Sequence, residues 1–301
     1  MKITDIINKE YENCEGEKIS EYKKPSCAYS ILVEKYQLWL EECDRLTEIH
    51  FNGLAGYHRE TMVEEKYSAA RRILSDISSK STSSNSILSK CTPEDIFQLS
   101  KTIVPFEYHE QFYESGLFFS SLINMHYSLH KNDPGQMVYQ LNFEKNEEHL
   151  FGIGYCLNGA SLFIQGNCGN CLGNNMQSGH ITLRGNAKHE AGARMNNGFI
   201  HILGSAENDV GHQMYGGEII IEKNTENFLG ERIFGGKITV KGNSGSHIGR
   251  GLNGGVIYIE GNYEKEQFAH TAQEGKIFHK GKLIFHKEKQ TITAKDSEEI
   301  K

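Results

Sequence analysis

Residues 216–234 read GGEIIIEKNTENFLGERIF, and residues 235–253 read GGKITVKGNSGSHIGRGLN. Each segment begins with two glycines, continues with a short run that has apolar residues two positions apart, and has another glycine near its end. Equivalent residues are 19 positions apart. A fixed period of this kind indicates a repeat in which each copy forms one structural unit, so it determines the fold of this part of the chain.

The same period extends over most of the sequence after residue 150. Glycine recurs at the start of each copy, at Gly179, Gly198, Gly217, Gly236 and Gly255. Each copy also carries β-branched or leucine residues two positions apart, which place both side chains on one face of a short strand. A further apolar column precedes each new copy and contains Met176, Met195, Met214, Ile233 and Leu252. Six or seven stacked copies would therefore enclose a continuous apolar interior.

We predict an α+β multidomain protein in which residues 151–285 form a single-stranded, right-handed parallel β-helix with coils of about 19 residues. A helical interpretation fails because several glycines per copy would each cost about 1 kcal/mol in a helix interior. The fragment GIGYCLNG at 152–159 partly matches a dinucleotide-binding fingerprint, but its glycines belong to the repeat and no long helix follows it.

The repeated pattern GG-x-I-x-V-x-GN-x6-G-x2-M, carried by residues 179–195 and 235–251, resembles the GXGXG β-helix domain. That domain ends the large subunit of glutamate synthase and also occurs in formylmethanofuran dehydrogenase. The resemblance covers about residues 150–285. It implies a spacer that packs catalytic domains or subunits together, while the redox chemistry takes place on other domains.

The first half of the chain has the spacing of helices rather than strands. Residues 28–49 place Leu32, Tyr36, Trp39 and Cys43 on one face, and the stretch around 63–77 repeats these steps. A serine-rich segment at 75–92 is interpreted as a loop, and Thr92 followed by a proline predicts a new helix start. We therefore expect a helical bundle over residues 1–135, a linker over 136–150 and a polar tail over 286–301.

Composition narrows the classes of partner. The formal charge is −7, which gives no reason to expect nucleic acid or an anionic membrane surface as partner. The start of the sequence, MKITDIINKE, has no apolar core of a signal peptide, and no stretch is long and apolar enough to span a bilayer. Seven unevenly spaced cysteines indicate reduced thiols. We expect a cytoplasmic protein without a bound cofactor.

Cys168 and Cys171 form a CxxC pair inside a glycine-rich loop, which is a spacing found in redox and zinc sites. The repeat argues against such chemistry. Cys168 falls in a column of small residues, so it is interpreted as a filler of a tight turn. Cys171 falls in a mixed column and is expected to be exposed, and Cys156 is assigned to the interior column of Met176. The pair is therefore the one metal candidate, and we expect no metal.

Other polar residues of the repeat define a candidate groove. They come from equivalent loop positions of successive copies, so several of them could face the same flank; they are His189, Glu190, Asp209, His212, Arg232, His247 and Arg250. Stacked turns also collect polar residues because such turns are exposed. In the first half, His126 lies on an apolar helix face and is interpreted as a packed histidine with one hydrogen bond rather than a ligand.

Three functions remain open. The first is a non-catalytic scaffold or interaction subunit that binds protein partners, either catalytic subunits of an oxidoreductase or amidotransferase system or further copies of itself. The second is an enzyme with a site between the helical domain and the β-helix flank. The third is a module that binds a sugar or another polymer. We favour the first because of the family resemblance and the regular coils.

Overall fold

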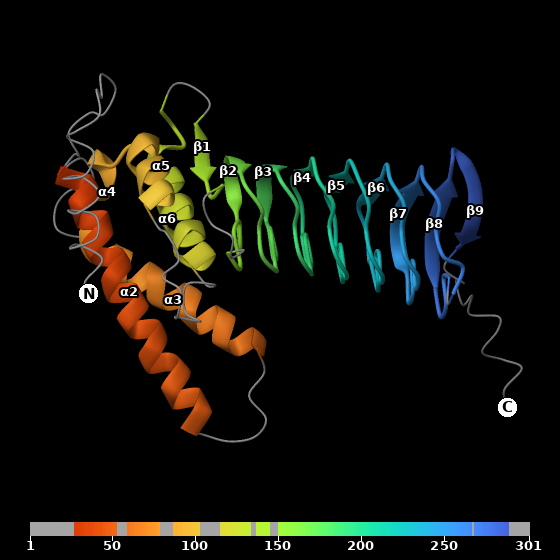
Figure 1. Ribbon diagram of the computed structural model, residues 1–301, viewed down its shortest axis with the longest axis horizontal. Coiled ribbons are helices and arrows are strands. Elements are labelled where there is room, and N and C mark those ends of the chain that lie inside the picture. The colour runs from red at the N-terminus through yellow and green to blue at the C-terminus, as the bar shows by residue number, and fades with distance from the viewer. Residues whose placement is uncertain are drawn as a thin grey trace, which may run out of the picture.

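The computed structural model describes residues 27–52, 59–78, 87–102, 115–133, 137–144, 150–266 and 268–288. Helices come first and a stack of β-coils follows, with the helices at one end of the stack (Figure 1). The helices are α2 (Cys27–Asn52), α3 (Arg59–Ser78), α4 (Ile87–Lys90), α5 (Pro93–Thr102) and α6 (Ser115–His130). The strands are β1 (Val138–Asn142), β2 (Asn158–Gln165), β3 (Ser178–Arg184), β4 (Phe199–Ile202), β5 (Glu218–Ile221), β6 (Lys237–Val240), β7 (Asn253–Ile259), β8 (Glu274–His279) and β9 (Lys282–Lys287).

The predicted parallel solenoid is confirmed. It has about seven turns with a spacing of about 19 residues. Strands β1 to β8 pair in parallel and in sequence order, so that Ile200 of β4 lies between Ile181 of β3 and Ile219 of β5. These isoleucines and the predicted column of Met176 and Met214 are fully buried. Stacking thus produces the continuous interior that the repeat predicts.

The solenoid extends beyond its predicted start, within the segment expected to be a linker. Residues 138–142 form β1, which pairs in parallel with β2. Tyr139 and Leu141 of β1 are fully buried and lie beside Leu162 and Ile164, where they cover the first complete coil. At the other end, β9 pairs with β8 in antiparallel orientation, so residues 286 and 287 of the predicted tail belong to the sheet.

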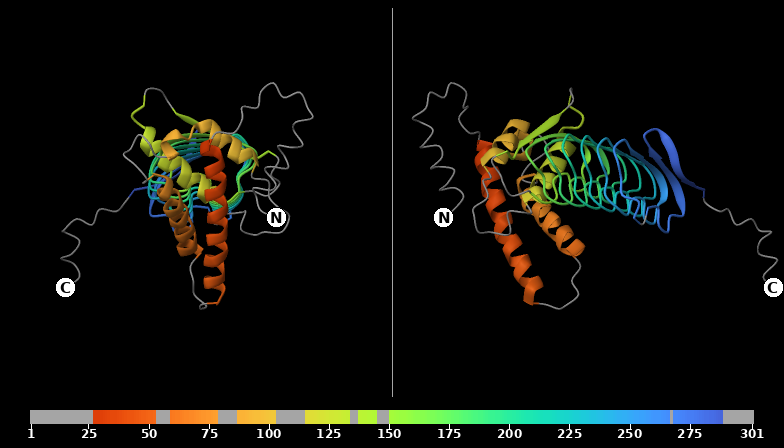
Figure 2. Two further views of the ribbon diagram at one scale, coloured as in Figure 1. Left: turned by 90° about the vertical axis from the view of Figure 1, so that its left-hand side faces the viewer. Right: turned by 45° about the vertical axis from the view of Figure 1, so that its right-hand side comes forward.

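Helix α6 closes the first coil. Ser120 donates to the carbonyl oxygen of Gly152 at 2.9 Å and accepts from the amide of Gly154 at 2.8 Å. The approach is close enough that a Cβ at Gly116 would collide with the carbonyl oxygen of Phe151. A view along the stack shows the helices lying across the end of the coils (Figure 2). Since the end of a solenoid exposes unpaired backbone groups, α6 acts as its cap.

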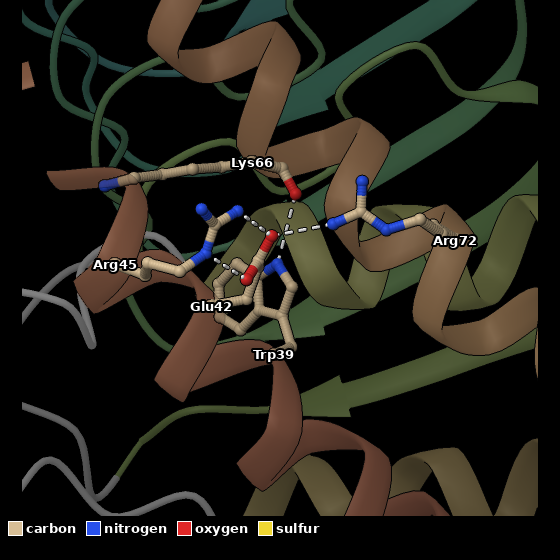
Figure 3. A network of polar contacts seen from close by, with 5 residues as sticks. All are labelled: Trp39, Glu42, Arg45, Lys66 and Arg72. Atoms are coloured by element: carbon tan, nitrogen blue, oxygen red, sulfur yellow. Dashed lines mark hydrogen bonds and ion pairs between the residues drawn. The ribbon is translucent and has the colours of Figure 1, made fainter. Parts of the chain in front are cut away.

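Helices α2 and α3 pack against each other through a tryptophan and a charged cluster (Figure 3). Trp39 is fully buried and donates its indole N–H to the carbonyl oxygen of Lys66 at 3.1 Å. Beside it, Glu42 accepts from Arg45 on its own helix and from Arg72 on α3, with a shortest distance of 2.7 Å in each case. The hydrogen bond from Arg45 is the main reason why the pKa of Glu42 lies below its usual value.

The predicted start of α5 is confirmed by its hydrogen bonds. The hydroxyl of Thr92 accepts from the amide of Asp95 at 3.2 Å, and the carboxylate of Asp95 accepts from the amide of Thr92 at 2.8 Å. This reciprocal pair is a capping box, which satisfies two amides at the helix start. The short helix α4 lies within the segment 75–92 that was interpreted as a loop.

Candidate functional site

Each coil has one corner built on left-handed backbone. The first left-handed position of this corner is occupied by non-glycine residues in five coils, namely Cys171, Glu190, Asp209, Phe228 and His247, with φ between 60° and 65°. A glycine follows two residues later, as in Gly211, and a third left-handed residue after two more, which is a non-glycine residue such as Gln213 in four coils and Gly251 in the fifth. Backbone amides of the corner pair alternately with the next and the previous coil, which holds these conformations in place.

This corner carries all seven predicted groove residues. Glu190, Asp209 and His247 occupy the first left-handed column, and His189 precedes that column by one residue. The third left-handed column contains Arg232, and the positions just before it contain the last two residues, His212 and Arg250. The predicted alignment along one flank is therefore what the 19-residue spacing produces.

Several of these side chains contact each other or a neighbouring coil. His189 lies 3.2 Å from Glu207, and His247 forms a 2.7 Å hydrogen bond with Ser246. Arg232 and Arg250 approach the carboxylate of Glu231 at 3.8 and 3.9 Å. The flank is thus a ladder of polar side chains, in which two of these contacts, His189 with Glu207 and Arg250 with Glu231, join neighbouring coils.

Asp209 is the most perturbed group of this ladder. Burial raises the pKa of its carboxyl above the usual value, and the negative charges of Glu231 and Glu190 act in the same direction. The nearby His212 and His189 oppose this shift. A half-buried carboxyl with a raised pKa is typical of catalytic acids, so this is the part of the flank best suited to acid–base chemistry.

Neither cysteine of the CxxC pair has the environment of a reactive thiol. Cys168 is buried in the column of small residues, as predicted, and burial raises its pKa to about 12. The predicted exposure of Cys171 is wrong, because its side chain is only 5% exposed and its thiol donates to Glu190 at 3.2 Å. No disulfide joins the two. The left-handed corner turns the Cys171 side chain against the next coil, which spacing alone does not reveal.

The predicted position of Cys156 is also wrong, by one residue. Its amide donates to the carbonyl of Asn174, as the amide of Asn175 donates to Ala193 one coil later, so Cys156 is equivalent to Asn175. The neighbouring Leu157 takes the interior place equivalent to Met176. Cys156 is half-buried, and burial raises its pKa to about 11.

The junction between the helices and the solenoid lies at the same corner of the first coil. Tyr155 packs edge-on against Tyr67 of α3, with ring centroids 5.1 Å apart. Asn124 of α6 donates to the hydroxyl of Tyr67 at 3.0 Å and to the carbonyl oxygen of Cys156 at 3.1 Å. This junction is a packed, hydrogen-bonded contact, and the predicted groove residues lie further along the stack, on later coils.

Two features of the repeat were not predicted. Asparagine side chains accept from a backbone amide of the next coil, as Asn167 does from Asn186 and Asn224 from Asn243, both at 2.8 Å. The asparagine after the glycine in the repeated GN pair was the available signal. The second feature is Tyr215 and Phe234, which are 54% and 47% exposed and stack with ring planes 7° apart. One face of each ring lies against the other ring.

Within the described ranges, no three His, Cys, Asp or Glu side chains are grouped so that they could hold a metal ion. None of the described helices has the length and apolar character needed to cross a membrane. No family model matches the chain, and no curated protein matches it.

Proposed function

We propose that this protein is a non-catalytic scaffold or interaction subunit whose solenoid acts as a spacer. The observation that carries the proposal is the ladder of polar contacts along the corner flank. Glu231 lies 3.9 Å from Arg250 of the next coil and Glu190 accepts from Cys171 of the preceding coil, so these groups contact neighbouring coils. A catalytic site requires groups that converge on a substrate, whereas these side chains extend along the stack.

The resemblance of the repeat to the GXGXG domain adds the class of partner. It supports a cytoplasmic protein that joins catalytic subunits of the oxidoreductase or amidotransferase type, with right-handed coils and a bundle-like helical part. In this proposal the helices close one end of the spacer, and the catalytic chemistry belongs to the partner.

The test is isolation of the tagged protein from its source cells, at its natural level and under gentle conditions, followed by native mass spectrometry. The proposal predicts a stoichiometric complex with a protein that carries its own catalytic or cofactor-binding domain. A complex that contains several copies of this chain together with that protein would also agree. Recovery of the monomer alone would contradict the proposal.

A second candidate function is an enzyme with its site at the corner flank. The raised pKa of the Asp209 carboxyl beside His212 favours it, since catalytic acids are often tuned in this way. Thermal shift measurements with metal ions and small metabolites provide the test. Stabilisation that disappears in Asp209→Asn would support an enzyme, whereas no shift with any ligand would count against it.

A further inference from the structure

The two ends of the β-sheet differ in what covers them. At the β1 end, the amide of Asn142 donates to the hydroxyl of Ser100 on α5 at 3.0 Å, and Tyr139 hydrogen-bonds to His126 on α6. At the other end, β9 is the last strand in the sheet order, and within the described part of the chain no strand pairs with its outer edge. Figure 1 shows β9 as the final layer of the stack.

Strand β9 has apolar side chains where an edge strand is usually polar. Its sequence is KLIFHK, and Leu283 and Ile284 are 50% and 37% exposed. The pairing with β8 shifts by one residue here, from Phe285 opposite Ile277 to Leu283 opposite Phe278, which leaves Ile284 without a partner residue on β8. An exposed edge with apolar side chains is a template for the addition of another strand.

The charges on β9 determine which kind of partner strand can pair with its outer edge. Basic residues lie at both ends of β9, with Lys282 at its start and His286 and Lys287 at its end, and Lys280 lies in the preceding turn. A second copy of β9 in symmetric antiparallel register would place Lys282 opposite Lys287, and parallel pairing would place each lysine opposite itself. Like charges directly opposite each other are destabilising, so the ends of β9 oppose self-pairing and favour an acidic strand.

We infer that the outer edge of β9 binds an extended, acidic segment of a partner protein as a tenth strand of the sheet. Backbone hydrogen bonds would supply the pairing, Leu283 and Ile284 the apolar contacts, and Lys282 the preference for carboxylates. The ammonium group of Lys287 already donates to the carbonyl oxygen of Ala272 at 2.7 Å. This inference rests on the proposed function as an interaction subunit and names the surface through which a partner docks.

The experiment uses the full chain and two labelled peptides of eight residues. One alternates glutamate with valine and threonine, and the other has lysine in place of every glutamate. Fluorescence anisotropy should show binding of the acidic peptide that weakens as salt is raised, because exposed charge pairs are screened. The basic peptide should not bind. Hydrogen exchange should show new protection of β9 amides when the acidic peptide is present.

Matched variants locate the contact. Lys282→Glu should weaken binding of the acidic peptide by about fivefold, as expected for loss of an exposed charge pair. Lys223→Glu makes the same charge change on an exposed residue in the middle of the stack and should leave binding unchanged. Equal effects of the two variants would show that only net charge matters and would overturn the inference.

Three further results would also overturn it. One is protection, in the free chain at low concentration, of the β9 amides that point away from β8, which would mean that the outer edge is already occupied. Another is protection that grows with protein concentration alone, which would indicate self-pairing. The third is equal binding of the two peptides. The inference can fail separately from the proposed function: a stoichiometric complex whose formation is insensitive to Lys282→Glu would keep the function and reject this surface.

Discussion

At the scale of single residues, the left-handed corners of the coils are the positions most sensitive to residue type. Glycine in this conformation costs little, whereas a side chain costs roughly 1–2 kcal/mol unless neighbours hold it there. The corner alternates the two kinds of position. Gly230 has φ of 68°, and the non-glycine Arg232 follows two residues later with φ of 55°.

Gly230 and Arg232 provide a matched pair of substitutions. A Cβ at Gly230 would lie 2.6 Å from the Cδ1 of Ile257 in the next coil, so Gly230→Ala should lower the free energy of unfolding by about 2–4 kcal/mol. Arg232→Gly should leave it unchanged or raise it, because Gly251 occupies the equivalent place one coil later. Urea unfolding followed by circular dichroism measures both. Equal destabilisation by the two substitutions would refute this explanation of the corner.

Asp209 provides a second test at this scale. Its raised pKa means that the charged carboxylate is unfavourable in the folded protein, and asparagine tolerates the left-handed conformation. Asp209→Asn should therefore raise the melting temperature at neutral pH, with a gain below about 1 kcal/mol because the group is only half-buried and partly screened by solvent. The gain should disappear as the pH falls and the wild-type carboxyl becomes protonated. A variant less stable at neutral pH would show that the charge has a favourable contact.

At the scale of elements, helix α6 is the cap that joins the two parts of the chain. Ser120 accepts from the buried amide of Gly154, so Ser120→Ala leaves that amide without its partner, whereas the carbonyl oxygen of Gly152 still accepts from the amide of Tyr155. We expect a loss of about 1–3 kcal/mol in the free energy of unfolding. Ser128→Ala removes a hydroxyl of the same helix that is exposed and bonded to Asn124 within the helix, so it serves as control.

The measurement for Ser120 can separate the two parts of the molecule. Trp39 is the single tryptophan and lies in α2, so its fluorescence reports unfolding of the helices, while far-ultraviolet circular dichroism also reports the coils. If α6 couples the helices to the coils, Ser120→Ala should shift the unfolding transition to lower denaturant concentration in both the fluorescence and the circular dichroism signal. No difference between Ser120→Ala and Ser128→Ala would contradict the role of the cap.

His126 links α6 to β1 and to the segment between α4 and α5, and makes this link dependent on pH. The carbonyl oxygen of Cys91 can only accept, so Nε2 of His126 donates to it at 2.8 Å, and Nδ1 accepts from the Tyr139 hydroxyl at 2.8 Å. The prediction of one hydrogen bond for His126 was therefore wrong, because its ring forms two. Burial is the main cause that lowers the pKa of His126, so the imidazole is neutral in the folded protein.

The pH dependence follows from this neutral state. The unfolded chain binds a proton at His126 below about pH 6.5, whereas the folded protein binds it only at lower pH. The free energy of unfolding should therefore fall as the pH is lowered through about 6.5, and His126→Gln should reduce this slope. Urea titrations at several pH values compare the two proteins. An identical slope in the variant would assign the effect to other groups.

The elements differ in how far the sequence predicts them. Strands β2 to β7 were predicted because Ile, Leu and Val recur in columns such as Ile219 and Ile238. Strand β1 was missed, because VYQLN has no glycine column and is recognised as a strand only through its pairing with β2. Strand β9 was missed in part because its antiparallel turn departs from the repeat.

The candidate site was also predicted only in part from the sequence. The columns placed Asp209, Glu190 and His247 on one flank, which spacing determines. Spacing does not determine which way a left-handed residue turns, so Cys171 was expected to be exposed and Cys156 was assigned to the wrong column. Nor does spacing reveal the pairing of Glu231 with two arginines, since that depends on side-chain conformation across coils.

At the scale of the whole molecule, the protein is a solenoid with one closed end and one open end. The helices close the β1 end, the flank residues connect coil to coil, and β9 presents an edge. These features agree with a protein that joins others. The central claim is therefore that the chain assembles a complex without taking part in its reaction.

The most direct test is the turnover of the complex isolated with this protein, compared with complexes that contain Asp209→Asn or His212→Gln. We predict full assembly by native mass spectrometry and turnover within about twofold of the unaltered complex, with loss of assembly only when the chain itself is removed. General acid–base groups contribute about 10²- to 10⁴-fold to rate. A fall of that size in either variant, with the complex still assembled, would contradict the claim and identify the flank as an active site.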